Sequence, residues 1–201
     1  MNEITEAAVE PGRQETVERI LEAGERLFRH YGYSKTTVAD IARDLGMSPA
    51  NIYRFFASKV EIHQAICGRM LAAVLQMITD ISKLPLPAAE RLGHCVIEQH
   101  RITLETMLDQ EKVHEMVIVA IERDWHVIER HIDRVQAVYA QIIREGIEAG
   151  EFADRDPEVA ARSFGATTVT LCHPQLVAQC LAKENRATPD ELIEFILRAL
   201  K

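Results

Sequence analysis

The stretch TTVADIARDLGMSPANIYRFFASK, residues 36–59, holds two short helical patterns that meet at Gly46. Each pattern opens with a hydroxyl residue: Thr37 precedes the first, and Ser48, followed by Pro49, precedes the second. Hydroxyl side chains cap the free N–H groups at a helix start, and proline fits the first helical position. Glycine supplies the turn because it adopts a left-handed backbone at little cost. The stretch therefore predicts a helix-turn-helix unit.

The rest of the chain also has helical periodicity. Apolar residues recur at spacings of three and four, and only nine of the 201 residues are glycine. Alternating strand patterns are absent, so we expect an all-α protein of about nine helices. After the first helix and the two short ones, helices are expected over about 58–83, 87–108, 111–122, 125–150, 157–182 and 188–200. Pro174 should kink the helix that contains it.

Composition limits the class of protein. Hydrophobic residues make up 47% of the chain, which is enough for a real core. The first fifteen residues are acidic and lack the apolar segment of a secretory signal. The four cysteines never form a C-x-x-C pair, so neither a zinc ribbon nor a disulfide scaffold is indicated. We expect a soluble, cytoplasmic protein that does not enter a membrane.

Charge is unevenly distributed along the chain. The formal net charge is -8, yet residues 13–60 hold eight basic and six acidic side chains. An acidic protein as a whole repels nucleic acid. A locally basic pair of helices in such a protein therefore indicates a segment that binds DNA. The acidic remainder would discourage indiscriminate binding and make affinity depend on correct docking.

The second helix of the unit divides into a buried and an exposed face. Ile52 and Phe56 lie one turn apart and should pack inward. The residues left outward are Pro49, Ala50, Asn51, Tyr53 and Arg54. A helix that enters a DNA groove needs small residues at the point of entry and an amide that can hydrogen-bond to a base edge. The phenol of Tyr53 and the guanidinium of Arg54 add groups that can bind DNA. A helical hairpin that does not bind DNA, with Tyr53 and Arg54 simply exposed to water, would give the same pattern.

Residues 36–62, TTVADIARDLGMSPANIYRFFASKVEI, resemble the signature of the tetracycline-repressor (TetR) family of transcriptional regulators. The resemblance is close over about residues 15–65 and extends to the remainder only in outline. It implies phosphate contacts from Thr37, Tyr53 and Lys59, base-edge contacts from Ser48, Pro49, Ala50, Asn51 and Arg54, and a place for Thr36 in the same DNA-binding set. Ala50 stands where the family often has glycine, and Asn51 where it often has threonine or serine, so no operator sequence is implied.

The resemblance also implies which segments of the chain bind DNA and which bind a ligand and a second chain. Residues 1–12 would be a disordered tail, 13–57 the helix-turn-helix DNA-binding domain, and 58–201 a ligand-binding and dimerisation domain. Such a protein would repress transcription from a palindromic operator and leave it when a small apolar effector binds. We expect no metal, no cofactor and no enzymatic activity.

Two sets of residues are candidates for the functions of the second domain. The effector-pocket candidates are Met70, Met77, Cys95, His100, Thr103, Met107, Met116, Trp125 and Phe164. The segment 159–182 is apolar or small on nearly every side, so its helix needs partners on both flanks. The dimer-face candidates, taken from this helix and the last one, are Val169, Leu176, Leu192 and Ile196.

Other interpretations remain open at this point. Methionines at helical spacing also serve as ordinary core, and an architectural DNA-binding protein without an effector would keep the same DNA reader. A helical-bundle metal enzyme would need two Glu-x-x-His motifs, whereas the chain has one, from Glu111 to His114.

Overall fold

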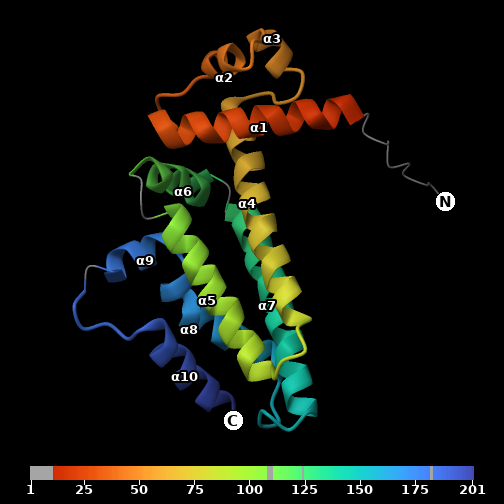
Figure 1. Ribbon diagram of the computed structural model, residues 1–201, viewed down its shortest axis with the longest axis vertical. Helices are drawn as coiled ribbons and strands as arrows, with labels where there is room; N and C mark the ends of the chain where they lie inside the picture. The colour runs from red at the N-terminus through yellow and green to blue at the C-terminus, as the bar shows by residue number, and fades with distance from the viewer. Residues whose placement is uncertain (1–10, 108–110, 124, 182) are drawn as a thin grey trace, which may run out of the picture. The chain divides into compact units, whose positions relative to one another are not determined.

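The computed structural model describes residues 11–107, 111–123, 125–181 and 183–201, which form ten helices and no strands (Figure 1). This confirms the all-α class. The helices are α1 (Pro11–Tyr31), α2 (Val38–Asp44), α3 (Pro49–Ile52), α4 (Lys59–Ser82), α5 (Ala88–Met107), α6 (Glu111–Arg123), α7 (Trp125–Glu148), α8 (Pro157–Cys172), α9 (Pro174–Leu181) and α10 (Pro189–Leu200).

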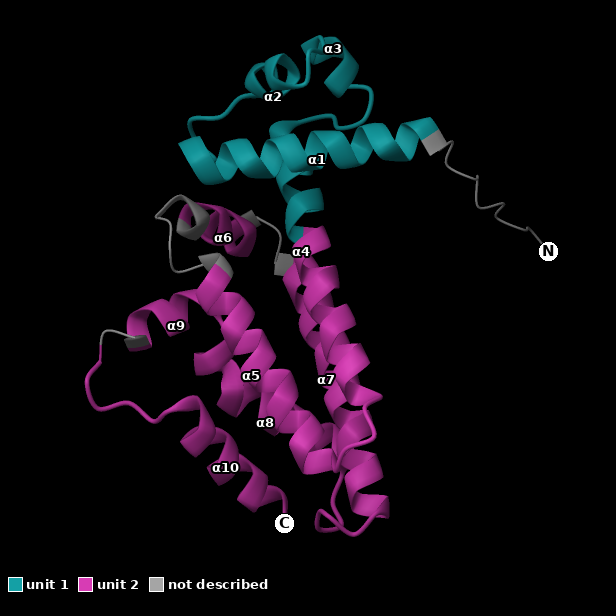
Figure 2. Cartoon of the chain, in the orientation of Figure 1, with its two compact units in different colours: residues 1–67 teal, residues 68–201 magenta. Residues whose placement is uncertain are grey.

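The chain forms two compact units, unit 1 over residues 1–67 and unit 2 over residues 68–201 (Figure 2). The division falls inside α4, ten residues later than the expected boundary. The cause is packing, because Ile62 and Ile66 in the first turns of α4 are fully buried in unit 1. The disordered tail expected for residues 1–12 lies, up to residue 10, outside the described residues, and α1 begins at Pro11.

Unit 1 is built around α1. Phe28, Ile41 and Ile52 are completely buried and join α1, α2 and α3 in one apolar core. Gly24 allows the start of α4 to approach α1 closely, because a Cβ there would lie 3.0 Å from Cγ2 of Ile62. The turn between α2 and α3 contains Gly46 with a φ of 65°, the left-handed conformation that favours glycine.

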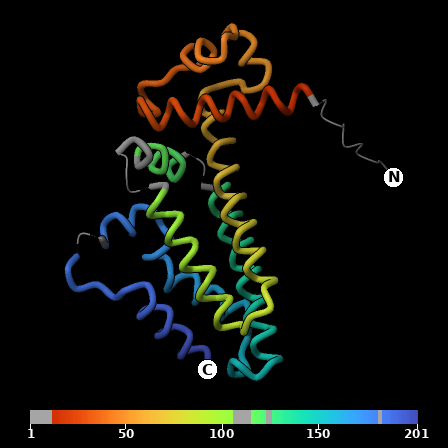
Figure 3. Tube along the Cα trace, viewed as in Figure 1, coloured from red at the N-terminus to blue at the C-terminus, as the bar shows by residue number. Residues whose placement is uncertain are grey.

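Unit 2 has its own core, formed mainly by α5, α7, α8 and α10. Leu92, Ile142, Ile143 and Phe164 are among its most deeply buried side chains. The chain reverses direction between α4 and α5, where the yellow end of α4 turns into the green α5 (Figure 3). The carboxylate of Glu151 caps the start of α5, accepting hydrogen bonds from the backbone N–H groups of the first two residues at 3.0 and 3.2 Å.

The kink expected at Pro174 is a complete break. Helix α8 ends at Cys172, and His173 is extended, with φ -83° and ψ 121°, before α9 begins at Pro174. Proline has no N–H to continue the helix, and it disfavours the helical conformation in the residue before it. One expected helix is therefore two, which accounts for ten helices among the described residues where about nine were expected.

Side chains from α5 bind the carbonyl groups that this break exposes. Nδ1 of His100 donates a hydrogen bond to the carbonyl oxygen of Leu171 at 2.7 Å. The hydroxyl of Thr103 lies 3.2 Å from the carbonyl oxygen of Cys172 and 2.9 Å from that of Gln99, both possible acceptors for its proton. Because buried carbonyls are costly without a partner, these contacts stabilise the broken helix.

Candidate nucleic-acid interface

The start of α2 is fixed by a reciprocal cap between Thr37 and Asp40. The backbone N–H of Asp40 donates to the Thr37 hydroxyl oxygen at 3.2 Å, and the backbone N–H of Thr37 donates to the Asp40 carboxylate at 2.9 Å. The Thr37 hydroxyl also donates to that carboxylate, at 2.6 Å. These bonds, the hydroxyl bond foremost, lower the pKa of Asp40. Thr37 itself is exposed.

Thr36 has a different role from the one expected. Its side chain is buried, and its hydroxyl lies 2.9 Å from the carbonyl oxygen of Gly32 and 3.3 Å from that of Leu27. A buried hydroxyl that donates inward cannot reach a phosphate. The placement of Thr36 in the DNA-contacting set is therefore corrected: this residue anchors the loop that positions Thr37.

Helix α3 presents the residues predicted for base recognition. Ser48 caps it, its hydroxyl accepting from the N–H of Asn51 at 3.3 Å, and Pro49 is the first helical residue. Ser48, Pro49, Ala50, Tyr53 and Arg54 are all exposed. Asn51 is half-buried, and its amide nitrogen lies 3.7 Å from Sδ of Met47, a weak contact that a base edge can replace. Ile52 is fully buried beneath them and holds α3 in place.

Lys59, expected at a phosphate, is also bound within the protein. Its Nζ donates hydrogen bonds to the carbonyl oxygens of Tyr33 at 2.9 Å and Thr36 at 3.0 Å. The same ammonium lies 4.2 Å from the centroid of the Tyr33 ring, which adds a cation–π contact. Lys59 thus ties the start of α4 to the loop before α2, and any phosphate contact would come in addition to this role.

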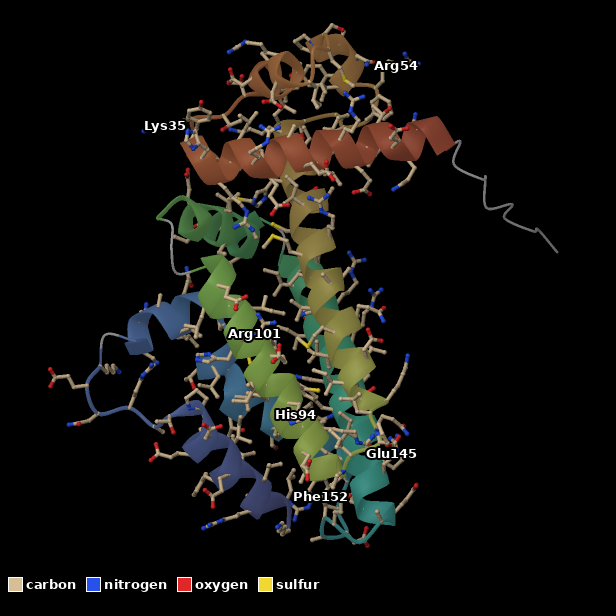
Figure 4. The ribbon with its side chains drawn as sticks, in the orientation of Figure 1. Lys35, Arg54, His94, Arg101, Glu145 and Phe152 are labelled. Atoms are coloured by element: carbon tan, nitrogen blue, oxygen red, sulfur yellow. The ribbon has the colours of Figure 1, made fainter. Side chains whose placement is uncertain are left out.

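The basic residues of unit 1 fall into two groups. Arg26, Arg29 and Arg43 form ion pairs with Asp44, Glu25 and Asp40, respectively. Within the described part of the chain, no ion pair involves Arg13, Arg19, Lys35 or Arg54, and all four are exposed. Lys35 and Arg54 lie near opposite ends of unit 1 (Figure 4). The charges of Lys35 and Arg54 are therefore available to a nucleic acid.

Comparison with known proteins assigns this arrangement to a family. Residues 88–193, more than half of the chain, match the family model described as "Tetracyclin repressor-like, C-terminal domain". Residues 20–66 match the model described as "Bacterial regulatory proteins, tetR family". The chain belongs to the TetR family. It is accordingly a DNA-binding transcriptional regulator with a helix-turn-helix unit, and not an enzyme.

Individual relatives are distant but extend along the chain. The uncharacterized HTH-type transcriptional regulator YhgD of Bacillus subtilis (strain 168) is 24% identical over 148 residues, covering 71% of this chain and 74% of its own. A TetR/AcrR-family regulator from Thermobifida fusca YX-ER1 superimposes with a TM-score of 0.69 at 23% identity, covering 92% and 96% of the two chains. A regulator from Saccharomonospora viridis in complex with choline gives 0.61 at 24% identity, covering 91% and 94%.

Four of the predicted pocket residues in this TetR-family chain are buried in unit 2. They are Cys95, His100, Thr103 and Phe164. Burial raises the pKa of the Cys95 thiol to about 12, so this cysteine is an uncharged core side chain. Met70 and Met77 on α4 are half-buried, and Met116 on α6 is buried. The side chains of Met107 and Trp125 lie outside the described residues.

Two further residues belong to this region and were not predicted. The buried ring of Tyr139 meets that of Phe164 edge to face, with centroids 5.1 Å apart. Burial raises the pKa of the Tyr139 hydroxyl well above its usual value. Nδ1 of His173, at the α8–α9 break, is buried and has no hydrogen-bond partner among the described residues. A helical pattern cannot reveal either feature, because both depend on residues distant in sequence.

The predicted dimer-face residues differ in exposure. Val169 is 39% exposed, Leu176 and Leu192 are half-buried, and Ile196 is buried in the core of its own chain. Phe195, the neighbour of Ile196, is 73% exposed and was not predicted. The exposed Phe195 ring and the buried Ile196 therefore lie on different faces of α10.

Proposed function

We propose that this regulator is a repressor that binds a palindromic operator as a homodimer. One α3 helix is short and offers few base contacts, so a single unit buries little surface on DNA. Two copies related by a two-fold axis would read two half-sites one helical turn apart, about 34–36 Å. The observation that carries this proposal is the half-buried amide of Asn51 on α3, with the exposed Ala50 and Tyr53 on either side of it in the sequence.

The apolar surface of unit 2 supports the dimer. Val159 and Val169 on α8 are 48% and 39% exposed, and Phe195 on α10 is 73% exposed, in the isolated chain. Large exposed apolar side chains on two helices are costly in water and are typical of oligomer contacts. A homodimer formed through these helices would cover them and fix the spacing of the two α3 helices.

We further propose that a small, mostly apolar molecule binds in unit 2 and weakens operator binding. Helix α4 is continuous from Lys59, which is bonded to the loop before α2, to Ser82 in unit 2. Met70 and Met77 lie on its later turns and are half-buried. A helix shared by both units would let a ligand bias the DNA-binding unit without touching it. Choline is the ligand of one distant structural relative, and so gives no guide to the ligand here.

Selection of bound duplexes from a random pool tests the operator proposal. We expect the recovered sites to share an inverted repeat, and sedimentation to give two protein chains per duplex. A thermal-shift screen with small apolar and cationic compounds would then supply a ligand. Linkage requires that ligand and operator weaken each other's binding by the same factor, about 5- to 150-fold for ordinary coupling. Equal ligand affinities with and without operator would contradict the effector proposal and favour an architectural protein.

We propose a cytoplasmic location for the regulator. Helix α4 is long and apolar enough to cross a membrane by length and composition alone. However, Ile62 and Ile66 are buried in unit 1, and Ile78 is buried in the core of unit 2. Both ends of α4 therefore pack against protein. Cell fractionation should recover the protein with the soluble fraction.

A further inference from the structure

We propose that Arg13, which precedes the helix-turn-helix and lies on α1, binds a phosphate of the operator backbone. The ring of Phe55 holds its guanidinium in position, with Cζ of Arg13 5.1 Å from the ring centroid. Phe55 directly follows Arg54, the last of the residues predicted to contact base edges. The contact therefore places the positive charge of Arg13, at the start of α1, beside the turn that follows α3.

The position of Arg13 on α1 explains this placement. Residues 13, 20, 24 and 27 follow one another at spacings of seven, four and three, so they share one face of the helix. Ile20 and Leu27 on this face are buried, and Gly24 lies against α2 and α4. Arg13 continues the same face beyond the core and is exposed. It is thus on the side of α1 that packs against the rest of unit 1, where it meets the ring of Phe55.

Phe55 is a firm support for the guanidinium. Its backbone N–H donates a hydrogen bond to the carbonyl oxygen of Ile52 at 2.9 Å, which continues the turn of α3. Its side chain is half-buried, while Ile52 is completely buried. A guanidinium stacked on an aromatic ring keeps its N–H groups at the edge of its plane, where they can bind a phosphate in a bidentate manner.

Charge favours a phosphate as the occupant. Among the described residues Arg13 forms no ion pair, whereas Arg26, Arg29 and Arg43 of the same unit all do. The cation–π contact restrains the side chain without neutralising its charge. A restrained, uncompensated guanidinium over Phe55, the residue that follows Arg54, is suited to the backbone of a duplex whose groove holds α3. Arg13 would then position the protein on DNA and add no base preference.

The test compares Arg13→Ala with Arg19→Ala in the full-length protein on a selected duplex, over a series of salt concentrations. Arg19 is the matched control because it is also exposed, unpaired and on α1, but lies about 120° around the helix from Arg13. We expect Arg13→Ala to weaken binding about tenfold per protomer on every sequence. The logarithmic salt dependence should also become shallower by about 0.9 for each phosphate that the protein no longer neutralises. Arg19→Ala should change neither quantity.

Two further variants separate phosphate binding from packing. Arg13→Lys keeps the charge but loses the planar guanidinium, so its affinity should lie between that of the wild type and Arg13→Ala. Phe55→Leu should weaken binding, and adding Arg13→Ala to it should cost less than in the wild type. If Arg13→Ala binds with the affinity and salt dependence of Arg19→Ala, the proposal is wrong. A weaker affinity with an unchanged salt dependence would likewise overturn it, because that result indicates packing alone.

Discussion

Phe152, in the loop after α7, packs against the backbone of Gly146 on α7, in the space that a side chain at position 146 would occupy. A Cβ at Gly146 would lie 2.5 Å from Cε2 of Phe152 and 2.8 Å from Cβ of Ala88. Phe152 is buried, and its N–H donates to the carbonyl oxygen of Gly146 at 3.2 Å. The end of α7 and the start of α5 therefore meet around a position without a side chain.

Gly146→Ala should lower the free energy of unfolding, although alanine is the better helix former. Overpacking typically costs about 1–3 kcal/mol, which exceeds the roughly 1 kcal/mol that alanine gains over glycine in a helix. Gly93→Ala in α5 is the control, because its Cβ would meet Cγ2 of Ile193 at 3.5 Å, an ordinary contact. Urea unfolding should show Gly146→Ala less stable than the wild type, and Gly93→Ala at least as stable.

Lys59→Ala should impair both stability and DNA binding. The substitution removes the ammonium donor from the carbonyls of Tyr33 and Thr36, and hydrogen bonds to charged groups contribute about 1.5–3 kcal/mol. We expect a loss of this order in urea unfolding, together with weaker binding to all duplex sequences alike. Lys35→Ala is the control, because Lys35 is exposed and should affect binding alone. An unchanged unfolding curve for Lys59→Ala would show that the two hydrogen bonds contribute nothing.

The helix-turn-helix can be predicted from residues close together in the sequence. The roles that could not be predicted are those of side chains whose partners lie far away in the sequence. Thr37, Ser48 and Gly46 act through neighbours within four residues, so their roles can be predicted from spacing. Lys59 binds carbonyl groups 23 and 26 positions earlier in the chain. The sequence motif shows that Lys59 is positively charged but does not show that it forms these two hydrogen bonds. Thr36 is an intermediate case, because its hydroxyl lies 2.9 Å from the carbonyl oxygen of Gly32, four positions away, and 3.3 Å from that of Leu27, nine positions away.

The second domain shows the same limit. Apolar spacing predicts that α10 has a buried face but does not determine which residues complete it. Ile196 is therefore in the core, where the sequence suggested the dimer face, and Phe195 is exposed. The break before α9 was expected only as a kink, because its completeness depends on His100 and Thr103 of α5 binding the exposed carbonyls.

Unit 1 should lose stability in acid partly through Asp40. Hydrogen bonds from the hydroxyl and the backbone N–H of Thr37 lower the pKa of Asp40 in the folded state. A lowered folded-state pKa stabilises the fold at pH values above the unfolded-state pKa, which is about 4, and this contribution is lost as pH falls below it. Asp40→Asn should therefore reduce the difference in unfolding free energy between pH 7 and pH 3. Thr37→Val should have a similar effect, and wild-type pH dependence in both variants would exclude the cap as a source.

Charged substitutions on α8 and α10 should separate the proposed dimer. Val169→Glu and Phe195→Glu each place a carboxylate on an exposed apolar position, where burial against a second chain would be costly. We expect monomers by sedimentation at micromolar concentration and much weaker operator binding, with the helical content of the wild type. Arg162→Glu, at an exposed position of α8 that already carries a charge, serves as the control. Dimers in both variants would place the interface elsewhere.

Asn51→Ala should relax sequence discrimination at one base pair of each half-site. The amide of Asn51 has only a weak contact with Sδ of Met47, so it can turn to a base edge without giving up a strong bond. An amide that pairs with adenine through two hydrogen bonds contributes about 1–3 kcal/mol of discrimination. Competition binding with a set of singly substituted operators should show this loss at one position, while the salt dependence stays as in the wild type. Lys59→Ala is the contrast, because it should weaken all operators equally. If Asn51→Ala also weakened every operator by the same factor, Asn51 would position the helix without reading a base.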